Sequence, residues 1–221
     1  MIDITVYNET GAEAGTVQLD ETRLGGTVRP GLLKQAFVRY HANRRSVNAT
    51  TKNRGMVEGS TRKLYKQKGT GNARRGDKKA NILRGGGMAH AKVGHSWRQD
   101  MPTKMRRLAN RNAILAKAID GEIRLIDIPA YDKPSTKQFK ALLAALKIDR
   151  SCLVALPDVR GHEARSSANL DNVTVTQLDR LNAFDLLNHR YVVAPKAAFE
   201  AYVAKVTEGV KTHSTDTAEA A

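Results

Sequence analysis

The chain has 221 residues, of which 37 are Lys or Arg and 22 are Asp or Glu, so its formal net charge at pH 7 is +15. This length allows one domain with a hydrophobic core and an appendage. The single Cys152 excludes a disulfide within the chain, and no apolar run approaches the roughly 18 residues that a membrane span requires. The first residues contain no apolar signal segment, so we expect a cytoplasmic protein with no membrane partner.

The first 43 residues are expected to form a β-hairpin followed by a helix. Alternating apolar residues predict a strand over residues 2–6, and a second apolar run predicts one over residues 16–19, with turn glycines between them. Pro30 is typical of the first turn of a helix, and the apolar spacing that follows predicts a helix ending near Ala42. The apolar positions of this helix are Leu32, Leu33, Ala36, Phe37 and Tyr40.

A helical spacing of apolar residues resumes after Pro102. Thr103 is expected to cap a helix that Gly121 ends. The face predicted to be buried consists of Met105, Leu108, Asn112, Leu115 and Ile119.

Strand and helix patterns then alternate to residue 206. Strands are expected over residues 123–128, 152–156, 173–176 and 191–194. Helices are expected over residues 135–146, 162–170 and 183–188, the last of them capped by Asn182. A final helix is expected to begin at Pro195 and to carry Phe199, Tyr202 and Val203. Such alternation predicts an α/β fold, with a largely parallel sheet and helices on both faces. Cys152 lies in an apolar run and is expected to be a buried strand residue rather than a nucleophile.

The basic arm, defined as residues 44–100, interrupts this pattern. From Arg39 to Arg111 there are 20 Lys or Arg and 3 acids, a local net charge of +17 that leaves −2 for the rest of the chain. We therefore expect a globular α/β domain of residues 1–43 and 101–206, with the arm inserted as a long extended basic loop. Residues 207–221 are small and polar, and we expect a disordered tail there.

The basic arm lacks the residues that build a core. It has 10 large apolar residues in 57, and 9 of the chain's 17 glycines. Ordering 57 residues would cost roughly 60–110 kcal/mol at about 1–2 kcal/mol each, so we expect its order to come from a partner. Concentrated cations favour a polyanion, and nucleic acid is the leading candidate. Tyr65 and Trp97 are candidates for stacking on bases.

The residues do not favour a nucleotide-binding, metal-binding or catalytic site. Neither Gly69-Thr70-Gly71 nor Gly85-Gly86-Gly87 fits a phosphate-binding fingerprint, and we expect the second to make a sharp backbone reversal, where the arm turns against RNA or another protein. The scattered histidines predict no metal site, and we expect no cofactor. Ser166 and Ser167 lack a nucleophile elbow or a base, and Asp127 and Asp132 are more simply strand-end or turn residues, so no catalytic constellation is predicted.

Several segments of the chain resemble bacterial large-ribosomal-subunit protein four, a universal ribosomal protein family. The matching segments are TKNRGMVEGS (51–60), QKGTG (67–71), RGGG (84–87), RRLA (106–109) and LNAFDLL (181–187). The resemblance covers most of the chain. It implies an α/β domain on the outer face of the large ribosomal subunit, with a loop that threads inward through ribosomal RNA and aids assembly.

The resemblance also implies site residues and partners. The loop tip, Gln67, Lys68, Gly69, Thr70 and Gly71, would line the nascent-peptide exit tunnel near its constriction beside large-subunit protein twenty-two. The expected ribosomal RNA contacts are Arg44, Arg45, Lys52, Arg54, Arg62, Lys63, Lys66, Lys68, Arg74, Arg75, Lys78, Lys79, Arg84, Lys92, Arg98, Arg106 and Arg107. No obligate homo-oligomer is expected.

The sequence departs from the family pattern at three places. Leu64-Tyr65-Lys66 stands where the family often has Pro-Trp-Arg. Asn72 replaces an arginine after Gly71, which removes one cation at the tip. Ala168 stands where the family has arginine, so no arginine contact is transferred to it.

Two alternatives remain open at this point. One is an RNA-modifying α/β enzyme that uses the basic arm as a substrate tether; it would need a cofactor cleft at the strand ends. The other is a free nucleoid or regulatory RNA-binding protein. Presence in purified ribosomes at one copy per particle, without a cofactor, would discriminate against the enzyme, whereas sedimentation of the native protein away from ribosomes would favour the free RNA-binding protein.

Overall fold

A computed structural model describes residues 1–46, 48–126, 131 and 133–208. The chain divides into two units by internal contacts. The globular unit comprises Met1–His41 and the residues from Asp100 onward, and the arm unit comprises Ala42–Gln99. The arm unit thus contains residues 44–99 of the basic arm.

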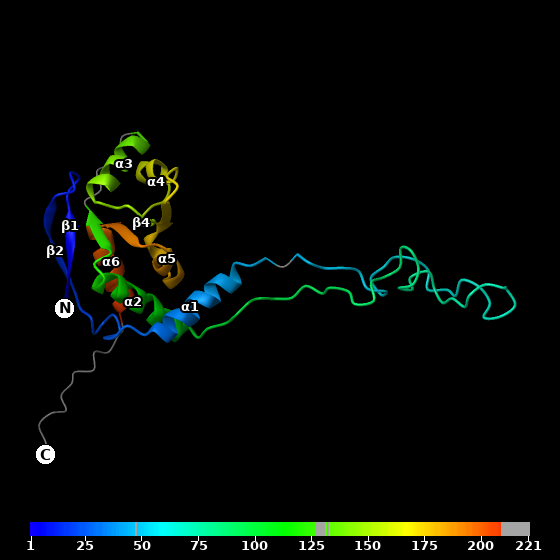
Figure 1. The fold of residues 1–221 in the computed structure, drawn as a ribbon. Helices are drawn as coiled ribbons and strands as arrows, with labels where there is room; N and C mark the ends of the chain where they lie inside the picture. Colours follow the sequence, from blue (N-terminus) through cyan, green and yellow to red (C-terminus); the bar gives the residue numbers. More distant parts are fainter. Residues whose placement is uncertain (47, 127–130, 132, 209–221) are drawn as a thin grey trace, which may run out of the picture. The chain divides into compact units, whose positions relative to one another are not determined.

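The globular unit is built on one six-stranded sheet (Figure 1). Its strands are β1 (Ile2–Tyr7), β2 (Glu13–Leu19), β3 (Ile123–Ile126), β4 (Cys152–Leu156), β5 (Val173–Gln177) and β6 (Tyr191–Pro195). The strand order is β2-β1-β3-β6-β4-β5. β1 and β2 pair antiparallel, whereas the other four pairings are parallel. The prediction of a largely parallel sheet is confirmed.

Helices cover both faces of the sheet, as the sequence predicts. They are α1 (Pro30–Asn43), α2 (Thr103–Ile119), α3 (Thr136–Ala145), α4 (His162–Ser167), α5 (Ala183–Asn188) and α6 (Lys196–Thr207), with a short 3-10 helix, η1 (Leu178–Arg180). Successive residues of β4 point to opposite faces. Leu153 and Ala155 pack with residues of α1, α2, α5 and α6, whereas Cys152, Val154 and Leu156 pack with residues of α3 and α4.

Capping side chains and a terminal glycine mark several of the helix boundaries. The side chain of Ser135 accepts a hydrogen bond from the Gln138 amide, and that of Asn182 accepts one from the Asp185 amide at 2.9 Å, so both predicted helix starts are capped. Gly121 follows α2 with a φ of 62°, a left-handed conformation that glycine adopts without strain.

Several predicted boundaries differ from the structure or fall outside it; the second strand, for example, begins at Glu13 rather than at residue 16. Thr103 is the first residue of α2 rather than its cap, since Pro102 occupies the cap position without a side-chain hydrogen bond. α4 ends at Ser167 and not at residue 170, because the Leu170 amide bonds to the Ser167 carbonyl in a turn. α6 includes Thr207, where the tail was expected to begin. Residues 127–128 of the third predicted strand and tail residues 209–221 lie outside the described residues.

The buried face of α2 is only partly the predicted one. Asn112 and Leu115 are fully buried as expected, but Met105 and Ile119 are exposed. The helix packs instead through small residues, and Ala109, Ala113, Ile114 and Ala118 are buried there. Small side chains allow the helix to approach the sheet closely, which a search for large apolar residues does not detect.

Candidate nucleic-acid interface

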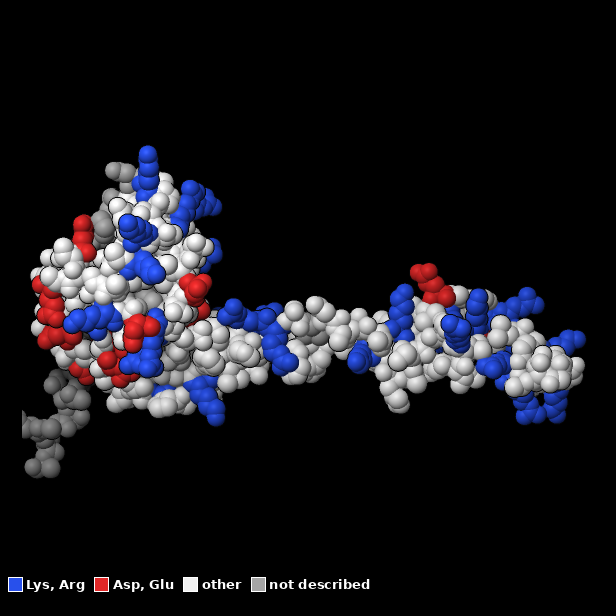
Figure 2. Space-filling view, turned by 45° about the horizontal axis from the view of Figure 1, so that its top comes forward, with Lys and Arg blue, Asp and Glu red and all other residues white. Residues whose placement is uncertain are grey.

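The arm unit concentrates positive charge. It contains 15 Lys or Arg against two acids, Glu58 and Asp77, a net charge of +13. Thirteen of these cationic residues are exposed, and only Arg75 and Lys79 are partly buried. Figure 2 shows blue side chains distributed over this unit with little red among them. A surface of this kind attracts a polyanion.

The unit contains no helix or strand among the described residues from Arg44 to Gln99. Its outgoing limb, residues 44–66, and its returning limb, residues 72–99, are instead joined by backbone hydrogen bonds. The Thr51 amide donates to the Lys92 carbonyl at 2.9 Å, and the Met88 amide donates to the Lys52 carbonyl at 2.9 Å. The Lys92 amide also donates to the Thr51 hydroxyl at 2.7 Å. These bonds give the arm a defined local structure of its own.

Two of the three glycines at 85–87 make close backbone contacts, Gly87 with the outgoing limb and Gly86 with Ala80 of its own segment. A Cβ atom on Gly87 would lie 2.3 Å from the Arg54 amide nitrogen, and one on Gly86 would lie 2.0 Å from the Ala80 carbonyl oxygen. Gly85 has a φ of 78°. The expected reversal is therefore present, and it packs against the arm's own backbone, a contact that the sequence did not predict.

Next to this contact lies the one buried acid of the described arm residues. The carboxylate of Asp77 is 6% exposed, and its Oδ2 accepts from Arg54 Nη2 at 3.1 Å. The side chain of Arg54 stays 63% exposed and can still meet a second anion. Arg54 is therefore a predicted contact residue that is already paired with an acid of the arm.

Residues 63–76 form a closed tip loop. The Lys63 ammonium donates to the Arg75 carbonyl at 2.9 Å and to Gln67 Oε1 at 2.7 Å. The Leu64 amide donates to the Gly76 carbonyl at 3.0 Å, and the Tyr65 hydroxyl donates to the Ala73 carbonyl. Three consecutive residues are thus bonded to the returning limb, so the tip is shaped before any ligand binds.

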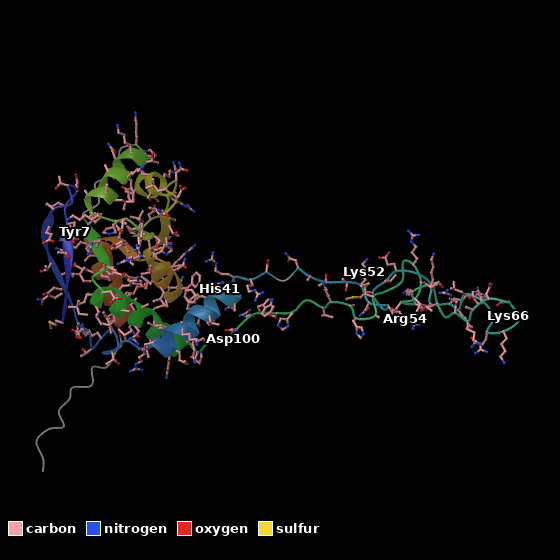
Figure 3. The ribbon with its side chains drawn as sticks, in the orientation of Figure 1. Tyr7, His41, Lys52, Arg54, Lys66 and Asp100 are labelled. Carbon is pink, nitrogen blue, oxygen red and sulfur yellow. The ribbon has the colours of Figure 1, made fainter. Side chains whose placement is uncertain are left out.

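The predicted tunnel-lining residues lie within this tip loop. Gly69 and Gly71 have φ angles of 84° and 70°, so both turn the chain in the left-handed region. Figure 3 shows Lys66 at one end of the arm unit, with Lys52 and Arg54 closer to its middle. Lys66, Lys68 and Arg74 are exposed around the loop.

The aromatic residues of the arm have different surroundings. The Arg45 guanidinium lies 3.9 Å from the centroid of the Trp97 ring, and His95 packs edge-on against the same ring at 4.7 Å. One face of the indole is therefore covered by a cation. Tyr65 is half-buried in the tip loop.

The structure separates the predicted RNA-contact residues into two groups. Fifteen lie in the arm unit, and the remaining two, Arg106 and Arg107, lie in the first turns of α2 in the globular unit. Arg39 and Arg111 belong with this second group, although the sequence pattern did not single them out. The Nε atoms of Arg39, Arg106 and Arg111 are enclosed without an acceptor among the described residues. Burial, and then the positive charge of Arg107, lower the pKa of Arg111.

The residues weighed for catalysis have structural roles where the structure describes them. Ser166 Oγ donates to the His162 carbonyl at 2.7 Å and accepts from the Ser135 amide at 2.9 Å. Ser167 Oγ donates to the Glu163 carbonyl at 3.0 Å. Cys152 is fully buried in β4, and burial raises the pKa of its thiol to about 12, which confirms the predicted strand cysteine.

Among the described side chains, His, Cys, Asp and Glu form no group of three that could hold a metal ion. None of the helices in the described part of the chain is long and apolar enough to cross a membrane. Asp127 and Asp132 lie outside the described residues.

Comparisons with known proteins agree with the resemblance seen in the sequence. The family model described as "Ribosomal protein L4/L1 family" matches residues 17–205. The large ribosomal subunit protein uL4 of Dehalococcoides mccartyi is 35% identical over 197 residues, which cover 89% of this chain and 94% of that protein. The uL4 protein of Rhodopirellula baltica is 34% identical over 225 aligned positions that span both chains completely.

The matched segment includes the basic arm and the globular unit from the end of β2 into α6. Proteins of this family are components of the ribosome in the cytoplasm and are not enzymes, which removes the alternative of an RNA-modifying enzyme with a basic tether. The chain therefore belongs to the ribosomal protein L4/L1 family and has that family's structural, non-enzymatic role in the large ribosomal subunit.

Proposed function

We propose that the basic arm binds ribosomal RNA of the large subunit and helps to organise that RNA during assembly. The observation that supports this most is the net charge of +13 on an arm unit whose cationic side chains are mostly exposed. Lys and Arg neutralise phosphates and release counterions, and arginine adds bidentate contacts. The fifteen arm cations named in the sequence analysis are the proposed contacts.

Arg106 and Arg107 provide a second contact region on the globular unit. Both lie in the first turns of α2, a helix with no acidic residue in its first turn. Arg39, Arg106 and Arg111 each keep part of the side chain exposed, so the accessible part of each guanidinium can donate to RNA phosphates. We therefore add Arg39 and Arg111 to the proposed RNA contacts.

The tip residues Gln67–Gly71 are proposed to line the nascent-peptide exit tunnel beside large-subunit protein twenty-two. The support is the family resemblance of this segment together with the closed loop that the structure shows around it. A tunnel wall must keep its shape while different peptides pass. The three bonds that close the tip provide such a shape.

The salt dependence of RNA binding tests the electrostatic part of this proposal. In the full-length chain, Arg62, Lys66, Lys68 and Arg74 are replaced by Ala, and affinity for a transcript of large-subunit ribosomal RNA is measured across a range of salt concentrations. The slope of log K against log salt should fall by about 3, at roughly 0.7–0.9 per lost phosphate contact.

The matched control replaces four exposed cations of the globular unit, Lys133, Lys137, Lys140 and Arg150. This variant has the same net charge as the tip variant, so a purely non-specific effect would change both slopes equally. Equal slopes in the two variants would contradict a specific role for the arm. An unchanged slope in the tip variant would do so as well.

A further inference from the structure

A hollow of about 660 Å³ lies beside the tip loop of the arm unit. Its lining includes the four cations Arg62, Lys63, Lys66 and Lys78, together with Leu64 and Tyr65. No Asp or Glu lines it. The volume falls within the range of about 300–1,000 Å³ that is usual for small-ligand sites.

We propose that this hollow receives a single unpaired nucleotide of ribosomal RNA. The proposal rests on the proposed function, because it assigns one specific ligand to the RNA-binding arm. The four cations that line the hollow supply the positive charge that the phosphate requires. The ring of Tyr65 and the side chain of Leu64 provide the apolar surface against which a base packs.

The wall of the hollow is fixed before the nucleotide enters. Lys63, Leu64 and Tyr65 each donate a hydrogen bond to a carbonyl of residues 73–76. Both acceptors of the Lys63 ammonium are neutral, so these bonds hold the ammonium in place without neutralising its charge. A preorganised site loses less conformational entropy on binding than a flexible one.

An unpaired nucleotide fits this arrangement better than the other chemistries a basic hollow can accept. A base-paired duplex presents only phosphates and groove edges, whereas an unpaired nucleotide also presents the face of its base. An acidic peptide would match the charge, but it would not use the flat face of a half-buried tyrosine. The combination of cations and one oriented aromatic ring therefore favours a nucleotide.

A fluorescent base tests the assignment in the full-length protein. The probe is a short RNA duplex with a single bulged 2-aminopurine, and the reference is the same duplex without the bulge. Binding should quench the 2-aminopurine, because the base stacks on Tyr65. Replacement Tyr65→Ala should abolish the quenching and reduce the preference for bulged over paired RNA by about 5- to 100-fold.

Three further variants separate stacking from other effects. Tyr65→Phe retains the ring and loses only the hydroxyl bond to Ala73, while the bonds of Lys63 and Leu64 still hold the wall, so it should retain most of the quenching. Lys78→Ala should weaken binding of bulged RNA and reduce its salt slope by about 0.7–0.9. Ile82→Ala, an exposed apolar residue of the arm outside the hollow, should behave as the wild type.

The outcomes distinguish this inference from the function on which it rests. Quenching that persists in Tyr65→Ala, or an equal affinity for bulged and paired RNA in the wild type, would overturn the nucleotide site while salt-dependent RNA binding continues. Loss of quenching in Tyr65→Phe as in Tyr65→Ala would also overturn it, because the ring would then not be the stacking surface. Absence of any salt-dependent RNA binding would refute the function itself.

Discussion

The guanidinium of Arg54 lies 3.1 Å from the carboxylate of Asp77, across 23 residues of the arm. Asp77 is buried in a unit of high positive charge, whereas the arginine remains largely exposed. The pair joins the outgoing limb to the segment that precedes the returning glycines. It is a tertiary contact in a segment without helices or strands among its described residues.

Replacement Asp77→Asn should loosen the arm without affecting the globular unit. It removes the carboxylate charge that pairs with the Arg54 guanidinium and places an amide N–H at the position of Oδ1, which is enclosed without a partner among the described residues. We expect a loss of about 1–3 kcal/mol in local stability. Limited trypsin digestion should then cut the arm about 10-fold faster, since 1.4 kcal/mol is a factor of ten.

Glu58→Gln is the matched control for that experiment, because it removes the same charge from an exposed acid of the arm. It should leave the cleavage rate close to that of the wild type. Equal acceleration in both variants would mean that net charge, and not the Arg54–Asp77 contact, controls access to the arm.

Replacement Gly87→Ala should open the close contact between the limbs. Its Cβ would lie 2.3 Å from the Arg54 amide nitrogen and 2.6 Å from Arg54 Cα, so the backbone must move, at a cost of about 1–3 kcal/mol. Hydrogen exchange at the Met88 amide, which bonds to the Lys52 carbonyl, should become faster. Gly76→Ala, where an added Cβ meets nothing within 4 Å, should leave that exchange unchanged.

Replacement Asn112→Ala should destabilise the globular unit strongly. The fully buried Asn112 side chain accepts from the Arg29 amide at 2.7 Å and donates to the Thr27 carbonyl at 2.6 Å. Its loss leaves two backbone groups without partners, so we expect the free energy of unfolding to fall by about 2–5 kcal/mol. Denaturant titration measures this. A loss no larger than that of Asn169→Ala, at an exposed turn, would refute the bridging role.

The buried thiol of Cys152 predicts a loss of stability at high pH. Burial raises its pKa from 9.0 to about 12 in the folded chain. Above pH 9 the unfolded chain releases this proton while the folded chain keeps it, so the free energy of unfolding falls by about 1.4 kcal/mol per pH unit. The contribution is fully present below pH 9 and is lost progressively as the pH rises toward 12.

Comparison with Cys152→Ala isolates this effect from other groups that titrate in the same range. The difference in the free energy of unfolding between wild type and variant should be constant from pH 7 to 8.5 and should then decrease. A difference that stays constant to pH 10.5 would show that the thiol ionises equally in both states.

Much of the globular fold was predictable because its signals are local. The alternation of strand and helix patterns, the caps at Ser135 and Asn182, and the glycine after α2 all depend on neighbouring residues. The burial of α2 was less predictable, since its contact face consists largely of alanines. Asn112 was placed on the buried face, but its partners near residue 28 come from a distant part of the chain.

In the arm, the composition was predictable but the contacts were not. Its charge was evident from composition, whereas its internal contacts join residues far apart in sequence and depend on the positions of backbone atoms. Neither Gly87 against Arg54 nor Tyr65 against Ala73 follows a periodic pattern. Arg39 of α1 and Arg111 of α2 were missed for a similar reason, because composition cannot distinguish a solvated arginine from one whose Nε lacks an acceptor.

A density map of the native ribosome that contains this protein tests the central proposal most directly. We expect density for Gln67–Gly71 at the wall of the peptide exit tunnel, next to large-subunit protein twenty-two, with ribosomal RNA along both limbs of the arm. A map in which the tip lies outside the tunnel wall, or in which the arm contacts only protein, would contradict it.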